Sequence, residues 1–206
     1  MTLSARQQQE IVEAAAVLRD GGLVAFPTET YYGLAVDPFN EQALERLFTV
    51  KKRLRLKPVL VLLAGREQLG LLAAEIPDIA GPLMDRFWPG PLTLVFPARP
   101  ELPALLTGGT ASVGVRQSPH PLATGLVRAF GSPLTATSAN RSGEAAAVTG
   151  GEVRRLFGTE VDLVLDGGAT PGRAGSTLIA VTRQGVRRIR EGCIPFREIE
   201  RLVNTT

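Results

Sequence analysis

The sequence contains very few of the side chains on which hydrolases and metalloenzymes usually depend. Its 206 residues include one histidine, His120, and one cysteine, Cys193. One histidine excludes His-rich zinc sites, and no nucleophile motif near it could complete a Ser-His-Asp triad. We interpret it as a satisfied loop or helix-start histidine and predict no protein metal ligands. One cysteine excludes an internal disulfide, which favours a reducing compartment. Catalysis here must rest on hydroxyls, lysine, arginine, backbone amides or a bound cation.

Long apolar runs are also lacking. The longest, such as 59–64, are too short to span a bilayer, and the N-terminus carries Arg6 and three glutamines without an apolar leader. Hydrophobic residues nevertheless make up 44% of the chain, which is enough for a substantial core. We therefore expect a cytoplasmic protein that has no membrane partner.

A strong excess of one charge is lacking as well. The net charge is +3, from 23 basic and 20 acidic residues, which by itself does not indicate nucleic-acid binding. The basic residues do cluster, at 51–57 and 183–190. The clusters are either two solvated surfaces or two segments that contact a polyanion together, and the second interpretation requires the fold to bring them close.

Hydrophobic periodicity predicts alternating helices and strands. The helices are expected at 4–20, 40–50, 67–74, 79–87, 119–130, 151–157 and 195–203. The strands are expected at 23–26, 58–64, 92–96, 113–115, 134–137, 163–165, 177–181 and 186–189. Residues 97–109 are rich in proline and glycine and are expected to form a surface excursion. We find no repeat or linker, and predict one α/β domain over 1–206, a twisted mixed β-sheet flanked by helices.

Hydroxyl and acidic residues follow the first predicted strand in the run Pro27-Thr28-Glu29-Thr30-Tyr31-Tyr32-Gly33. Ligands of α/β sheets tend to lie at such strand ends, so the run could orient a polar small molecule. An ordinary turn explains any one of these residues but explains the whole run less well. The lone cation Arg116 also follows a strand and is either a carboxylate partner or half of a surface ion pair.

Two further segments are candidates for phosphate contacts. Lys51-Lys52-Arg53, with Arg55 and Lys57, could hold phosphate oxygens or form a solvated surface. Ser138-Ala139-Asn140-Arg141-Ser142-Gly143 could bring backbone amides and hydroxyls close to a phosphate or form an ordinary turn. Neither a Walker loop nor a Rossmann fingerprint occurs in the chain. A Gly-rich stretch at 166–177 either closes over a ligand or is only a long connection.

Taken in order, these segments resemble the YrdC-like family, the threonylcarbamoyl-AMP synthases. The resemblance runs from about Gly22 to Gly192. It rests on several short motifs in a fixed order: Pro27-Thr28-Glu29-Thr30 with Tyr32-Gly33-Leu34, Lys51-x-Arg53, Phe87-Trp88-Pro89-Gly90-Pro91-Leu92-Thr93, Val113-Gly114-Val115-Arg116, Thr137-Ser138-Ala139-Asn140 with Ser142-Gly143, Asp166-Gly167-Gly168, Ser176-Thr177 and Arg190-Glu191-Gly192.

The resemblance implies a YrdC/RibB-like fold and a nucleotidyltransferase reaction. ATP, L-threonine and bicarbonate would give threonylcarbamoyl-AMP and pyrophosphate, with magnesium on the phosphates, and threonylcarbamoyl-transferase enzymes would use the product to modify tRNA. Lys51 and Arg53 would be the catalytic residues. The residues implied for ATP are Lys51, Arg53, Lys57, Ser112, Ser138, Asn140 and Arg190. The residues implied for threonine are Thr28, Thr30, Tyr32, Arg116 and Ser176.

The chain also departs from the family pattern. It carries Leu54 in place of proline, Lys57 in place of asparagine, Leu62 in place of a histidine of longer relatives, Gly175 in place of glutamate, and Tyr31 in place of valine. We also expect the short, single-domain type without an extra C-terminal domain. Two alternatives remain: a double-stranded RNA or tRNA-binding protein of this fold without the activity, and a divergent member that uses another acyl acceptor.

Overall fold

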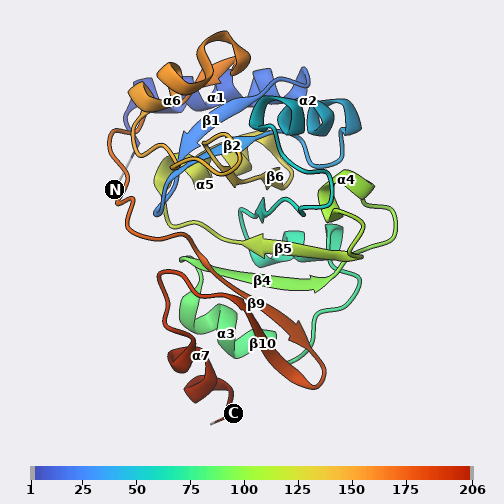
Figure 1. The fold of residues 1–206 in the computed structure, drawn as a ribbon. Coiled ribbons are helices and arrows are strands. Elements are labelled where there is room, and N and C mark those ends of the chain that lie inside the picture. The colour runs from blue at the N-terminus through green and yellow to red at the C-terminus, as the bar shows by residue number, and fades with distance from the viewer. Residues whose placement is uncertain (1–2, 205–206) are drawn as a thin grey trace.

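The computed structural model describes residues 3–204, and its strands form two mixed sheets (Figure 1). The smaller sheet has the order β7-β2-β1-β8. Its strands are β1 (Val24–Pro27), β2 (Tyr32–Ala35), β7 (Thr137–Ser138) and β8 (Leu163–Val164). β2 lies antiparallel to both β1 and β7, whereas β8 lies parallel to β1.

Helices cover both faces of the smaller sheet because successive side chains of a strand point to opposite faces. Val24 and Phe26 of β1 belong to one buried cluster with α1 and α5, and Ala25 belongs to a second cluster with α2 and α6. These helices are α1 (Ala5–Arg19), α2 (Glu41–Lys51), α5 (Pro121–Phe130) and α6 (Gly150–Phe157).

The predicted starts of α1 and α2 are confirmed, because local hydrogen bonds fix them, whereas α5 begins at residue 121 rather than 119 and α6 at 150 rather than 151. Ser4 caps α1 in a capping box with Gln7. The Asn40 side chain accepts from the Ala43 amide at 3.1 Å and caps α2. His120 is the helix-start residue of α5, as expected, because its Nδ1 accepts from the Leu122 amide at 3.3 Å.

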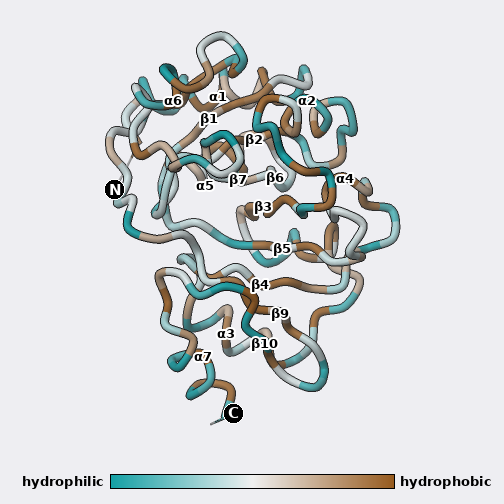
Figure 2. The backbone as a smooth tube through the Cα atoms, in the orientation of Figure 1, coloured by the Kyte–Doolittle hydropathy of each residue, from teal (hydrophilic) through white to brown (hydrophobic). Residues whose placement is uncertain are grey.

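The larger sheet has six strands in the order β10-β9-β4-β5-β3-β6. They are β3 (Val61–Leu62), β4 (Leu92–Pro97), β5 (Ser112–Arg116), β6 (Leu134–Thr135), β9 (Thr177–Thr182) and β10 (Gly185–Arg190). Around this sheet lie α3 (Ala80–Phe87), α4 (Ala104–Thr107), α7 (Phe196–Val203) and the 3-10 turn η1 (Arg66–Leu71), whereas a second 3-10 turn, η2 (Gly158–Glu160), continues α6 beside the smaller sheet. Figure 2 shows hydrophobic colours along β3 and β4 and hydrophilic stretches on β10, whose residues are largely exposed.

The two sheets meet where the chain passes from β6 to β7. Thr135 ends β6 in the larger sheet, and Thr137 begins β7 in the smaller one. Backbone hydrogen bonds from Thr135 to Val36 (3.1 Å) and from Ala136 to Leu60 (2.7 Å) hold this crossing in place. Loops from both sheets therefore come together at the crossing.

Several predicted elements differ from the structure. The strand expected at 134–137 is split between the two sheets, and the strand expected at 58–64 is reduced to Val61–Leu62, where β5 and β6 flank it. The helix expected at 67–74 is a 3-10 turn. The strand Tyr32–Ala35 was not predicted at all.

The segment at 97–109 is not simply a surface excursion. It contains the short helix α4, and its side chains Leu102 and Leu106 are buried. Within residues 3–204, no helix has the length and apolarity needed to cross a bilayer.

Candidate functional site

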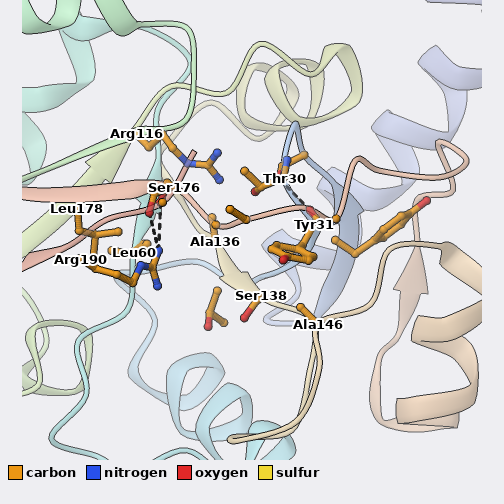
Figure 3. A pocket seen from close by; sticks show the side chains of 18 of the residues that line it. Thr30, Tyr31, Leu60, Arg116, Ala136, Ser138, Ala146, Ser176, Leu178 and Arg190 are labelled. Carbon is orange, nitrogen blue, oxygen red and sulfur yellow. Dashed lines mark hydrogen bonds between the residues drawn. The ribbon is translucent and has the colours of Figure 1, made fainter. Parts of the chain in front are cut away.

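A cavity of about 590 Å³ lies at the junction of the two sheets. Its walls come from the β1–β2 turn, the loop after α2, the end of β5, the β6–β7 crossing, the loop after β7, the Gly-rich loop before β9 and the segment after β10. Figure 3 shows the side chains of 18 of these residues around the open space and labels ten of them. The lining residues are Thr28, Thr30, Tyr31, Tyr32, Gly33, Arg53, Pro58, Leu60, Arg116, Ala136, Thr137, Ser138, Ala145, Ala146, Val148, Gly172, Ala174, Gly175, Ser176, Leu178, Arg190, Glu191 and Gly192.

Three arginines from separate segments reach this cavity. Arg53 donates to the Pro58 carbonyl at 2.6 Å and to the Lys57 carbonyl at 3.2 Å, which fixes its guanidinium after α2. Arg190 donates to the Ser176 carbonyl at 2.8 Å (Figure 3). Burial lowers the pKa of both groups, but arginine stays charged at neutral pH. The cavity is therefore built to attract anions.

The third cation, Arg116, forms a buried ion pair with Glu29 in the β1–β2 turn. The Arg116 side chain is 6% exposed and that of Glu29 is 15% exposed. Burial, together with the nearby Arg190, lowers the pKa of Arg116 to about 10, so the guanidinium remains charged at neutral pH. The Glu29 carboxylate also accepts from the Ser118 hydroxyl. Sequence reasoning allowed a surface ion pair here but did not identify Glu29 as the partner or predict its burial.

Buried hydroxyls line the cavity beside Arg116. The Thr28 and Thr30 hydroxyl oxygens lie 3.0 Å apart, and Thr28 also donates to the Tyr31 carbonyl at 2.7 Å. The Ser176 hydroxyl accepts from the Thr93 hydroxyl at 2.8 Å. These bonds fix the direction of each hydroxyl before any ligand enters, which lowers the ordering cost of binding.

The structure joins the Lys51 segment to the Ser138–Asn140 segment. The Lys51 ammonium donates to the carbonyl of Ser138, to the carbonyl of Asn140 at 2.8 Å and to the Asn140 side-chain oxygen at 3.2 Å. Lys51 is 1% exposed and is absent from the cavity lining. Burial, together with the nearby Arg53, lowers its pKa to about 7. In this geometry Lys51 stabilises the Ser138–Asn140 loop from the side away from the cavity. Of Lys51 and Ser138, only Ser138 reaches the cavity.

Three other predicted residues lie outside the cavity lining. The Asn140 side-chain oxygen accepts a hydrogen bond from the Ser138 hydroxyl at 2.7 Å, and its side-chain nitrogen donates to the Glu144 carbonyl at 2.8 Å. Asn140 therefore stabilises the same loop. Lys57 is exposed on the loop after α2. Ser112 lines a neighbouring apolar groove of about 590 Å³ that shares Pro58, Leu60 and Leu178 with the cavity.

Tyr32 lines the cavity, but its hydroxyl serves the Gly-rich loop. It donates to the Gly168 carbonyl at 2.8 Å, lies 3.1 Å from an Asp166 carboxylate oxygen and accepts from the Gly167 amide at 3.1 Å. Burial raises the pKa of Tyr32 to about 12. The loop that follows supplies Gly172, Ala174, Gly175 and Ser176 to the wall.

Sequence reasoning missed most of the small and apolar lining residues. Tyr31 was named only within the run after the first strand and as a departure from the family, and Glu191 only as part of a motif. The other missed residues carry no chemical signal, and all except Leu178 of β9 come from loops: Pro58, Leu60, Ala136, Ala145, Ala146, Val148 and Leu178. Only the fold shows that they share a cavity.

The sequence matches the Sua5/YciO/YrdC family, described as telomere recombination, over residues 16–192. The chain belongs to this family. The resemblance drawn from the motifs is thereby confirmed.

Relatives and solved structures of the family agree with this assignment. The threonylcarbamoyl-AMP synthase of Pseudomonas aeruginosa is 42% identical over 176 residues, which are 84% of the chain and 94% of that protein. The one from Pyrococcus abyssi is 40% identical over 197 residues, which are 96% of the chain and 58% of that protein. The crystal structure of P. abyssi Sua5 complexed with L-threonine gives a TM-score of 0.91 at 40% identity, covering 95% of the chain and 57% of that structure.

The fold prediction is confirmed by the same comparison, since mixed sheets flanked by helices are shared with a family structure. The chain spans a little over half the length of the P. abyssi relative.

Proposed function

We propose that this chain is an L-threonylcarbamoyladenylate synthase that converts ATP, L-threonine and bicarbonate to threonylcarbamoyl-AMP and pyrophosphate. The observation that carries the proposal is the convergence of Arg53, Arg116 and Arg190 in one cavity lined with oriented hydroxyls. ATP is anionic and the threonine zwitterion presents a carboxylate, so a site that holds the two together needs several fixed cations. The name of the nearly full-length P. aeruginosa relative supports the same activity.

We assign the two substrates to different parts of the cavity. Arg53, Arg190 and Ser138 would contact the ATP phosphates, with Lys51 and Asn140 holding the Ser138 loop behind them. Arg116, Thr30 and Ser176 would contact threonine, Arg116 through the substrate carboxylate, while Thr28 and Tyr32 shape that end. The P. abyssi complex with L-threonine supports an amino-acid site in this fold. The roles of Lys57 and Ser112 at the nucleotide remain predictions.

The chemistry needs no nucleophile from the protein. Carboxylation of the threonine ammonium group by bicarbonate gives a carbamate and releases one water molecule and one proton. A carbamate oxygen then attacks the α-phosphorus of ATP, the bond from that phosphorus to the bridging oxygen breaks, and pyrophosphate leaves. Positioning of the two reactants and stabilisation of the charge that develops on the phosphate oxygens can provide the rate enhancement. Arg53 and Arg190 supply fixed positive charge for the second of these tasks.

Magnesium is proposed as the ion that ATP brings on its phosphates. Among residues 3–204, no group of three or more His, Cys, Asp or Glu side chains could hold a metal ion. We therefore assign no protein ligand to magnesium and treat it as part of the substrate. Since the product is a reactive mixed anhydride, a threonylcarbamoyl-transferase would have to take it up and transfer the group to tRNA.

Pyrophosphate release tests the proposal. We expect release that requires ATP, threonine and bicarbonate together, with threonylcarbamoyl-AMP identified by mass spectrometry. Release that continues without threonine would refute the substrate assignment, and turnover with serine in place of threonine would indicate another acyl acceptor. Salt-sensitive RNA binding by an R53A variant, with no turnover by the wild type, would instead support the RNA-binding alternative.

A further inference from the structure

We propose that Arg141 is a positioning residue that fixes the phosphate-facing wall of the cavity, an inference that rests on the proposed function. In the chain, Arg141 lies between the lining residues Ser138 and Ala145. Figure 3 shows Ser138 and Ala146 on this side of the cavity, across from Ser176 and Arg190. Arg141 itself is absent from the lining, and its side chain is only 18% exposed.

The Arg141 guanidinium links the loop to the ends of two helices. It donates to the carbonyl of Val50 in the last turn of α2 and, at 3.5 Å, to the carbonyl of Leu156 in the last turn of α6. The last carbonyls of a helix have no partner within the helix and carry partial negative charge. One cation therefore satisfies two helix ends at once.

Two more contacts fix the plane of the guanidinium. Both oxygens of Glu160 accept from it, and this hydrogen bonding holds the pKa of the Glu160 carboxyl below its ordinary value. The Phe157 ring centre lies 5.1 Å from the guanidinium carbon. A planar, forked group can meet the carbonyls, the carboxylate and the ring together.

The backbone beside Arg141 is fastened to the same helix end. The Ser142 amide donates to the Lys51 carbonyl at 2.9 Å, and the Lys51 ammonium donates to the carbonyls of Ser138 and Asn140. Arg53 follows only two residues after Lys51, and its amide bonds back to the Phe48 carbonyl at 2.9 Å. Arg141 thus locks the Ser138 loop against the helix that presents Arg53, and this sets how the two phosphate-facing groups lie relative to each other.

The motifs that carry the family resemblance include residues 138–140 and 142–143 but not residue 141. A lysine at this position would supply one compact charge and could not bridge both helix ends, Glu160 and the ring. We therefore expect R141A to lose the link and R141K to keep part of it.

Isothermal titration calorimetry with ATP, and separately with threonine, tests the inference. In R141A we expect ATP affinity to fall at least tenfold while threonine affinity stays within twofold, because Arg116 and Thr30 lie on other segments. R141K should recover part of the loss. The control is R66A, which breaks the exposed Arg66–Asp85 pair (2.7 Å) and should change neither affinity.

The outcomes separate positioning from general stability. If Arg141 only stabilised the fold, R141A would lower the affinity for ATP and for threonine together. That result, or an unchanged ATP affinity in R141A, overturns the inference. If R141A does not fold, judged by circular dichroism, the ATP-to-threonine comparison in R141K decides the question. A wild-type chain that binds threonine but not ATP would refute the proposed function itself, which is distinguishable from loss of binding in the variant alone.

Discussion

At the scale of single residues, the Arg116–Glu29 pair is the feature that most constrains the proposed chemistry. The Glu29 carboxylate pairs with one nitrogen of the Arg116 guanidinium, and the Ser118 hydroxyl donates a hydrogen bond that holds Glu29 in place. Burying an unpaired cation costs several kcal/mol, so the pair stabilises the charge when the cavity holds no ligand. The remaining N–H groups of the guanidinium can then meet a substrate carboxylate without reorientation.

Replacing Arg116 by lysine tests this account. The ammonium can still pair with Glu29, but it lacks the second edge of the fork. We expect R116K to lower threonine affinity at least tenfold and to leave ATP affinity within twofold, measured by calorimetry. R66K is the matched control. An equal loss of affinity for threonine and for ATP would contradict the assignment of Arg116 to threonine alone.

The buried Lys51 predicts a pH dependence of stability. Its pKa is about 7 in the folded chain, against an ordinary value of 10.5. Between these values the unfolded chain binds a proton that the folded chain has released, so the free energy of unfolding should rise with pH from about 7 to 10.5. The slope from this group approaches about 1.4 kcal/mol per pH unit.

Urea unfolding of the wild type and of Lys51→Met between pH 7.5 and 9.5 measures this slope. The wild type should gain stability relative to the variant as pH rises, since other titrating groups are common to both. Parallel curves would show that Lys51 keeps its proton over this range.

Residue types predicted the charges of the site but not the partners of those charges. Lys51 and Arg53 were expected to share a site with Ser138, because cations and hydroxyls carry a chemical signal. The structure bonds Lys51 to the Ser138 carbonyl and places Arg53 and Ser138 in one cavity wall, while their contact with a phosphate stays a prediction. The acceptors of Lys51 are mainly backbone carbonyls, which every residue has, so no pattern of side chains could reveal them. The same holds for Arg141, whose partners lie at two helix ends.

At the scale of elements, prediction succeeded where local interactions decide the structure. The starts of α1 and α2 follow from Ser4 and Asn40, whose side chains bond to amides three residues later. β2 was missed because Tyr32–Ala35 is buried throughout and shows no alternation. Its strand form depends on pairing with β1 and β7, which is set by tertiary structure.

The Gly-rich loop before β9 depends on one hydroxyl from β2. Replacing Tyr32 by phenylalanine removes the bond to the Gly168 carbonyl and leaves the Gly167 amide without its acceptor. We expect the free energy of unfolding to fall by about 1–3 kcal/mol in urea denaturation. Threonine affinity should fall as well, because the loop supplies Ser176 to the cavity.

Tyr31→Phe provides a matched control for this change. The Tyr31 side chain is only half-buried, so loss of its hydroxyl should change stability by less than about 0.5 kcal/mol. Equal destabilisation in the two variants would mean that the Tyr32 hydroxyl does not anchor the loop.

At the scale of the whole molecule, the fold decides between the two interpretations of the basic clusters. One arginine from each cluster, Arg53 and Arg190, enters the shared cavity. Other members form surface ion pairs: Arg55 with Glu45, Arg183 with Glu75 and Arg188 with Glu191. Each cluster is thus partly a solvated surface and partly a contributor to one cavity, a division that no linear pattern could show.

Because the cavity walls come from both sheets, ligand binding should stabilise the whole fold. Threonine at 100 times its dissociation constant would add about 2.7 kcal/mol if it binds only the folded chain. For a chain of this size, that corresponds to a rise of about 5 to 10 °C in the unfolding midpoint, measured by differential scanning fluorimetry. Mg·ATP should give a comparable rise.

The two shifts should respond differently to substitution. R116K should abolish most of the threonine shift at the same concentration and preserve the ATP shift, whereas R53A should do the reverse. If both variants lost both shifts, the two substrates could not have separate contacts in the cavity. If threonine and ATP together gave a rise larger than the sum of the two, binding of one would favour the other, as expected when each orders loops that also border the other's site.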